Sequence, residues 1–181
     1  MKFPKNEKGF TLIETLVAIV IFASAITALI SITAGGISNT NFVKNKFTAG
    51  YLALEGAELI HNIRDTVSIT DSSAGWGATT SALTSCMEPS ACWIDVWGTN
   101  SPASCGSSED CPAMDYNRQS GKFNYAGSDG QNNLQSIFTR IISIKIVSDS
   151  EIRVTSKVYW LQGTQLHTVS YSYDLLNWTS P

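Results

Sequence analysis

The pattern of apolar and polar residues changes sharply along this chain of 181 residues. From Leu16 to Ile32 the sequence holds only apolar or small residues, and no Asp, Glu, Lys or Arg occurs between Thr15 and Val43. Counted from Phe10 to Ala34, the run is long enough for a helix that spans a membrane. Glu14 is its one charged residue, and a carboxylate in such a position requires a partner.

The pattern becomes amphipathic after Gly36. Residues 41–65 place apolar side chains at helical spacings among polar ones: Phe47, Tyr51, Leu54, Ala57 and Leu59. We therefore predict one long helix from about Phe10 to about Arg64, whose second half packs on a globular head. Glycine disfavours helix, so Gly35-Gly36 would be a flexible joint between the halves. Gly50 and Gly56 would allow close packing against a sheet.

The C-terminal part alternates between apolar and polar residues over 136–147, 150–161 and 166–176, with turns at 148–150 and 162–164. This alternation predicts a three-stranded antiparallel meander with one buried face. The residues assigned to that face are Ile142, Ile144, Ile146, Ile152, Val154, Val158, Trp160, His167, Val169, Tyr171 and Tyr173. The amphipathic half of the helix would cover this face.

Between the helix and the meander, residues 66–133 are rich in Ser, Thr, Gly, Asn and Asp. We predict a long ordered loop region here, because Trp76, Trp93 and Trp97 need burial. The segments "ACWIDVW" and "GKFNY" are candidates for short strands.

All four cysteines lie in this region, in the pattern C-x5-C-x12-C-x5-C: Cys86, Cys92, Cys105 and Cys111. Structural zinc sites usually separate paired ligands by two to four residues, so the spacing is not typical of a metal site. Disulfides are typical of an exported head. Three connectivities exist, and the symmetrical spacing favours the local pairs Cys86–Cys92 and Cys105–Cys111.

Composition and charge exclude several classes of function. The chain is 43% hydrophobic and 15% charged, with a net charge of −3, so no basic surface suggests nucleic-acid binding. Neither an HExxH nor a GxSxG motif occurs, and there are only two histidines, so we expect no enzyme, no catalytic residue, no cofactor and no metal. Lys2, Lys5 and Lys8 precede the apolar run, which favours a cytoplasmic N-terminus. A secretory signal peptide is the alternative interpretation of this segment.

The segment "GFTLIE", Gly9 to Glu14, resembles the prepilin motif of type IV pilins and of the pseudopilins of type II secretion and competence systems. The resemblance implies that a prepilin peptidase cleaves between Gly9 and Phe10 and that Phe10 is then N-methylated. It also implies that Glu14 pairs with the amino group of a neighbouring subunit. A buried carboxylate and ammonium that meet only in the correct register would fix the alignment of subunits.

The C-terminal segments "FTRIISI", "RVTSKVYW" and "YDLLNW", with their endings Trp160 and Asn177-Trp178, resemble minor pilins of the pilus-modification (PilV) type and minor pseudopilins. The fold implied is α+β, the type IV pilin fold, in which a long N-terminal helix packs on a C-terminal antiparallel meander. The expected organisation is a cleaved basic leader (1–9), a transmembrane and filament-core helix (10–36) and a globular head (37–181). Within the head, 66–133 would be the cysteine-bearing loop region and 134–178 the meander.

The expected function is that of a structural subunit, a minor pilin of a type IV pilus. The alternatives are a minor pseudopilin of a type II secretion or competence system, and a tip adhesin that binds a surface ligand. The partners implied are the prepilin peptidase, other pilin subunits, the inner-membrane assembly platform and the membrane. The chain would span the inner membrane once, with its head outside the cytoplasm, and then enter an extracellular pilus.

Overall fold

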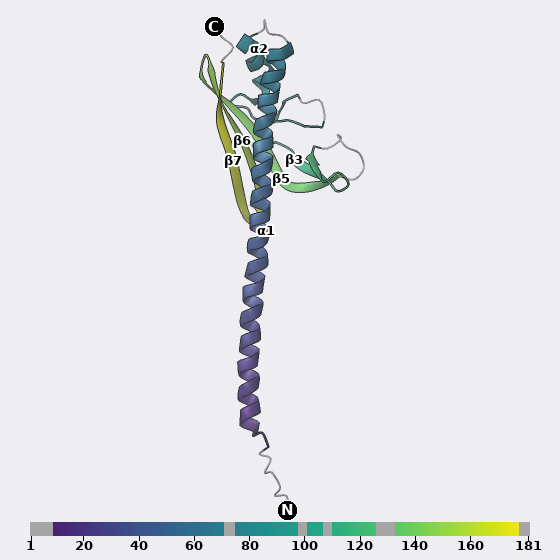
Figure 1. Ribbon diagram of the computed structural model, residues 1–181, viewed down its shortest axis with the longest axis vertical. Coiled ribbons are helices and arrows are strands. Elements are labelled where there is room, and N and C mark those ends of the chain that lie inside the picture. Colours follow the sequence, from purple (N-terminus) through teal and green to yellow (C-terminus); the bar gives the residue numbers. More distant parts are fainter. Residues whose placement is uncertain (1–8, 71–74, 98–100, 107–109, 126–132, 178–181) are drawn as a thin grey trace, which may run out of the picture. The chain divides into compact units, whose positions relative to one another are not determined.

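The structure is a computed structural model, and it describes residues 9–70, 75–97, 101–106, 110–125 and 133–177. The chain divides into two compact units, Met1–Lys44 and Asn45–Pro181. The elements are the helices α1 and α2, a short 3-10 helix η1, and an antiparallel sheet of seven strands (Figure 1). This arrangement confirms the α+β fold expected from the sequence.

Helix α1 extends over Leu12–Thr70 and is helical at Gly35-Gly36, so the joint predicted there is not a break in the helix. It also continues past Arg64, and the prediction that a loop begins at residue 66 is wrong. The last turns are rich in Ser and Thr, which often end helices. Here the Ser68 hydroxyl donates to the Arg64 carbonyl at 2.9 Å and the Thr70 hydroxyl to the Thr66 carbonyl at 2.7 Å. These bonds keep the hydroxyls within the helix.

Three long strands form the predicted meander. Strand β5 covers Asn133–Ser148, β6 covers Glu151–Gln162 and β7 covers Gln165–Leu176. Strand β6 pairs antiparallel with both neighbours, in registers that include Phe138 with Trp160 and Val158 with Val169. The turn between β6 and β7 has Gly163 at a φ of 63°, a left-handed conformation that glycine adopts without strain.

The region between α1 and β5, where the sequence predicted an ordered loop region with short strands, contains several short regular elements. Helix α2 covers Gly75–Ala82, and η1 covers Thr84–Cys86. Four short strands follow: β1 (Cys92–Trp93), β2 (Ala103–Ser104), β3 (Ala113–Asn117) and β4 (Lys122–Asn124). Both candidate segments, "ACWIDVW" and "GKFNY", do contribute strands, β1 and β4.

These short strands extend the sheet beyond the meander. Strands β1 and β3 both pair with β5, through Cys92 with Ile142 and Ala113 with Thr139, while β2 pairs with β1 and β4 with β3. Strand β5 is therefore the central strand of the second unit.

Both faces of β5 are covered near its middle. On the face toward α1, which we call the inner face, Ile142 and Ile144 pack with Ile60 of α1 in the main hydrophobic cluster. On the outer face, Ile141 packs with Ala91, Cys105 and Cys111 in a second cluster. In Figure 1, the part of α1 that belongs to the second unit runs along the sheet.

Several sequence-based burial predictions are wrong, among them that of Tyr171 on β7, whose side chain is 44% exposed. Ile146 was assigned to the buried face, and its side chain is 59% exposed because it lies near the end of the inner face. Trp97 was expected to be buried and is 47% exposed, with the Lys122 ammonium 3.5 Å from its ring centroid. The other assigned residues of β6, from Ile152 to Trp160, are buried as predicted.

Candidate functional site

The segment that carries the prepilin motif begins directly before α1. Gly9 and Phe10 are exposed and precede the first helical residue, Leu12. The peptide bond between them is therefore outside the helix, where backbone is more accessible to proteolysis. The rest of the expected leader, residues 1–8, lies outside the described residues.

Thr11 and Glu14 together start the helix. The backbone N–H of Glu14 donates to the Thr11 side-chain oxygen at 3.4 Å and to the Thr11 carbonyl at 3.1 Å. Thr11 is thus the N-cap and Glu14 the third helical residue, in the Thr-x-x-Glu spacing of a capping box. This role of Thr11 was not predicted, although the spacing is visible in "TLIE".

The Glu14 side chain is exposed and forms no ion pair with any described residue. Its position in the first turn is electrostatically favourable, because the N-terminus of a helix carries a partial positive charge. The carboxylate is therefore held near Phe10 and remains available to a cation from another molecule.

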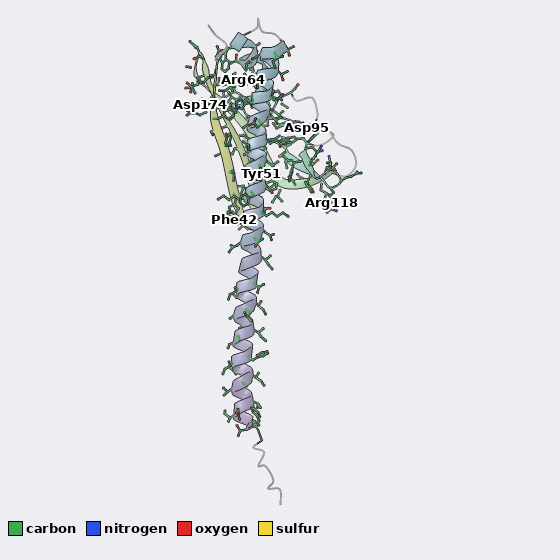
Figure 2. All side chains as sticks on the ribbon, viewed as in Figure 1. Phe42, Tyr51, Arg64, Asp95, Arg118 and Asp174 are labelled. Carbon is green, nitrogen blue, oxygen red and sulfur yellow. A yellow bond between two sulfur atoms is a disulfide. The ribbon has the colours of Figure 1, made fainter. Side chains whose placement is uncertain are left out.

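The helix that follows is long and apolar enough, by length and composition, to cross a membrane. Figure 2 shows its side chains along the first unit, where Leu16, Ile21 and Phe22 are among many exposed apolar residues. Hydroxyls in this stretch bond to carbonyls one turn earlier: Ser24 to Ile21 at 2.8 Å and Thr33 to Leu29 at 2.6 Å. Polar groups satisfied in this way are compatible with a hydrocarbon environment.

The structure contains two disulfides, Cys86–Cys92 and Cys105–Cys111, which are the local pairs that the spacing favoured. No free cysteine remains. The first disulfide is wholly buried in the main cluster of the inner face, whereas the second belongs to the cluster on the outer face. Among the described residues, no group of His, Cys, Asp and Glu side chains could hold a metal ion.

A buried arginine that was not predicted from the sequence joins α1 to the sheet. The Arg140 side chain on β5 is fully buried, and its Nη1 lies 2.7 Å from the Glu55 carboxylate on α1. The same guanidinium donates to the backbone carbonyls of Leu52 at 3.4 Å and Ile94 at 2.9 Å. The signal was an Arg within the apolar segment "FTRIISI", opposite a helix that carries Glu.

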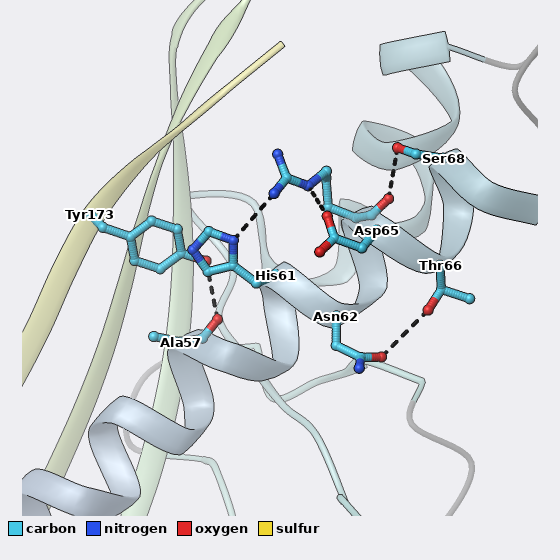
Figure 3. A network of polar contacts seen from close by, with 8 residues as sticks. Ala57, His61, Asn62, Asp65, Thr66, Ser68 and Tyr173 are labelled. Carbon is cyan, nitrogen blue, oxygen red and sulfur yellow. Dashed lines mark hydrogen bonds and ion pairs between the residues drawn. The ribbon is translucent and has the colours of Figure 1, made fainter. Parts of the chain in front are cut away.

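A second polar contact joins α1 to β7 (Figure 3). The Tyr173 hydroxyl donates to the Ala57 carbonyl at 3.1 Å, and the His61 ring stacks on the Tyr173 ring with centroids 4.4 Å apart. Burial raises the pKa of the Tyr173 phenol, and the charge of Glu58 adds to this effect. Together with the arginine contacts, this network joins the part of α1 in the second unit to the sheet.

Comparisons with known proteins agree with this arrangement. Residues 4–37 match the family described as the prokaryotic N-terminal methylation motif. The chain is 36% identical over 55 residues to a protein of Escherichia coli named type II secretion system protein I. That similarity covers 30% of this chain and 45% of the relative, so the chain spans less than half of the relative's length. No solved structure matches the chain.

Proposed function

We propose that the chain is a type IV pilin-like protein, a minor subunit of a type IV filament that assembles through its N-terminal helix. The methylation motif, the exposed apolar helix and the antiparallel sheet support a structural subunit of the pilin and pseudopilin class. Structural subunits of this class are not enzymes.

The observation that carries the proposal is the position of Glu14 in the first turn of α1, close to Phe10 and without an ion pair among the described residues. Cleavage after Gly9 would create an ammonium group on Phe10. Within hydrocarbon, an unpaired carboxylate or ammonium costs several kcal/mol. Two subunits in the correct register would satisfy both groups, whereas a shifted subunit would leave both unpaired.

Processing and location follow from the same segment. The prepilin peptidase would cut between Gly9 and Phe10 and Phe10 would be N-methylated, while the helix holds the chain in the inner membrane with its head outside the cytoplasm. Both disulfides fit a head in an oxidising compartment. The assembly platform and neighbouring pilin-like subunits are the proposed partners.

We place the subunit in a pilus, so that it is part of an extracellular filament after assembly. The second candidate is a minor pseudopilin, which the similarity to type II secretion system protein I favours. The two differ in where the assembled subunit is found. A pilus subunit is recovered in filaments sheared from the cell surface, whereas deletion of a secretion pseudopilin blocks export of secreted enzymes and leaves surface pili unchanged.

The test of assembly uses Glu14→Gln, which removes the charge and keeps the size of the side chain. We expect normal membrane insertion and normal cleavage, with Phe10 found as the N-methylated first residue, but strongly reduced incorporation into filaments. If the variant enters filaments in the same amount as the protein without the substitution, Glu14 does not set the register.

The matched control is Thr11→Ala, which removes the helix cap but keeps the Glu14 carboxylate. Loss of an N-cap costs about 1 kcal/mol of helix stability. We expect this variant to assemble. If Thr11→Ala loses filaments as strongly as Glu14→Gln, weakening the start of the helix is sufficient to block assembly, and the loss is not specific to the charge of Glu14.

A further inference from the structure

A cavity of about 330 Å³ lies at the end of the inner face of the sheet, between α2 and the turn that joins β5 to β6. Its walls include Trp76, Thr80 and Thr84 from the α2 and η1 region, and Ile146 and Asp149 from β5 and the turn. Its volume is at the lower end of the range for small-ligand sites in proteins. All of these residues belong to the second unit.

One side of the cavity is apolar. Ile146 is the exposed end of the row of inner-face isoleucines, and Ile152, its cross-strand partner on β6, is fully buried. Trp76 and Met87 are partly buried against the main cluster, so they are held in place by the core while they line the cavity. A tryptophan ring fixed in this way is a suitable surface for an aliphatic stem or a cation.

The polar part of the cavity wall consists of the hydroxyls of Thr80, Ser81, Thr84 and Ser148 and the carboxylate of Asp149. The Thr80 hydroxyl donates its hydrogen to the carbonyl of Gly77 at 3.0 Å, and the Thr84 hydroxyl donates to the carbonyl of Ser81 at 2.8 Å. A hydroxyl carries one hydrogen, so these two can offer a ligand only their lone pairs. Asp149 adds a carboxylate, and an ionised carboxylate accepts hydrogen bonds but donates none.

The negative charge of Asp149 is not neutralised by another residue that lines the cavity. No described residue that lines it is Lys, Arg or His, and Asp149 forms no ion pair with a described residue. An anionic ligand would meet the carboxylate and be repelled. A ligand with hydrogen-bond donors, a positive charge and a short apolar stem would match the acceptors, the carboxylate and the Trp76 ring together.

We propose that this cavity binds a primary ammonium group on an aliphatic stem, and that its natural occupant is a lysine side chain of a partner protein. The ammonium donates to Asp149 and to the threonine oxygens, and the stem packs on Trp76 and Ile146. A neutral sugar fits less well, because it carries no positive charge to pair with the Asp149 carboxylate. The proposal does not depend on filament assembly, since the cavity lies within the head.

The probe is n-butylammonium chloride, titrated into the full chain in detergent micelles with its tryptophan side chains labelled with ¹⁵N. The indole signal of Trp76 is assigned with Trp76→Phe. We expect n-butylammonium to shift this signal selectively, at constant ionic strength, while butyrate and sodium chloride do not. Asp149→Asn should weaken the apparent affinity about tenfold, as expected when a charge-assisted hydrogen bond of about 1.4 kcal/mol is lost.

The matched control is Glu151→Gln, which removes a carboxylate from the same hairpin that does not line the cavity. This variant should bind n-butylammonium with an affinity within about twofold of the unmodified protein. An equal response to neutral 1-pentanol would identify a purely apolar pocket and overturn the proposal. Binding of methyl glucoside without binding of n-butylammonium would overturn it in favour of a sugar site. An unshifted Trp76 signal with every probe would also refute it.

Discussion

Arg140 and Glu55 form an ion pair, with 2.7 Å between Nη1 and Oε2, that joins β5 to α1 across the core of the head. The two side chains differ in exposure, since Arg140 is 0% exposed and Glu55 is 38% exposed. The Arg140 charge can therefore be stabilised only by its protein partners, whereas the Glu55 carboxylate also contacts solvent.

We predict that Glu55→Gln destabilises the head by about 2–3 kcal/mol, because it leaves the buried guanidinium without a countercharge. Glu58→Gln is the control, since Glu58 lies nearby on the same helix and is exposed. This control should change the free energy of unfolding by less than about 0.5 kcal/mol. Urea unfolding of the full chain in micelles, followed by tryptophan fluorescence, measures both. Equal losses for the two variants would mean that the ion pair contributes nothing specific.

Two glycines of α1 give a matched pair of predictions. A Cβ at Gly56 would clash with the Ser156 hydroxyl and lie 2.8 Å from the Arg140 Cδ, whereas a Cβ at Gly50 would meet no atom within 4 Å. Gly56→Ala should therefore destabilise the head by about 1–3 kcal/mol through overpacking. Gly50→Ala should stabilise it by up to about 1 kcal/mol, because alanine favours helix. Melting temperatures that shift in the same direction would contradict this assignment.

The two disulfides should be reduced in a defined order. Cys86 and Cys92 are fully buried, whereas Cys105 and Cys111 are 9% and 7% exposed. A reductant in increasing concentration should therefore open Cys105–Cys111 first, and alkylation followed by mass spectrometry will identify the freed thiols. Each closed loop is short, so each disulfide should contribute about 2 kcal/mol. Alkylation of Cys86 and Cys92 before the other pair would show that local burial does not control access.

We predict that the head loses stability at alkaline pH because of Tyr173. Burial raises the pKa of the Tyr173 phenol, so the folded state favours the neutral form. The neutral Tyr173 phenol therefore contributes to the free energy of unfolding. This contribution is complete below about pH 10, the usual pKa of tyrosine in an unfolded chain, and is lost as the pH rises toward the higher pKa of the folded state. Tyr173→Phe should reduce the decline in stability above about pH 10, apart from the part due to Tyr125, whose pKa burial also raises.

The control for this experiment is Tyr51→Phe, because the Tyr51 side chain is exposed (Figure 2). It should leave the pH dependence of unfolding unchanged. At neutral pH, Tyr173→Phe should cost about 1 kcal/mol, since the carbonyl of Ala57 loses its hydrogen bond. An unchanged alkaline decline in the Tyr173 variant would assign the effect to other groups.

The sequence predicted the elements whose pattern is local. The meander was found because its strands alternate over many residues and its turns are short. Strands β1 to β4 were not assigned as a set, because strands of two to five residues carry too little periodicity. They exist because β5 offers a second edge, and such long-range pairing is invisible in the short segments themselves.

The candidate site divides in the same way. The motif from Gly9 to Glu14 and the pairing of the cysteines could be predicted, because both depend on spacing along the chain. The partners of the buried Arg140 side chain could not be predicted, since Leu52, Glu55 and Ile94 lie far from it in sequence. The exposure of Trp97 could not be predicted either, because it depends on which surfaces the sheet leaves uncovered.

The central position of β5 has a consequence for the order in which the head forms. Strand β5 bonds to β6 across a short turn, but to Cys92 and Ala113 only across much longer loops. Closing the short loop first costs less chain entropy, so the hairpin of β5 and β6 should nucleate folding. The cysteine-bearing segment precedes β5 in the chain, yet it has no sheet to join until that hairpin forms. Its thiols therefore reach their native positions only after the hairpin has formed, and oxidation before that point would trap them in the wrong pairs.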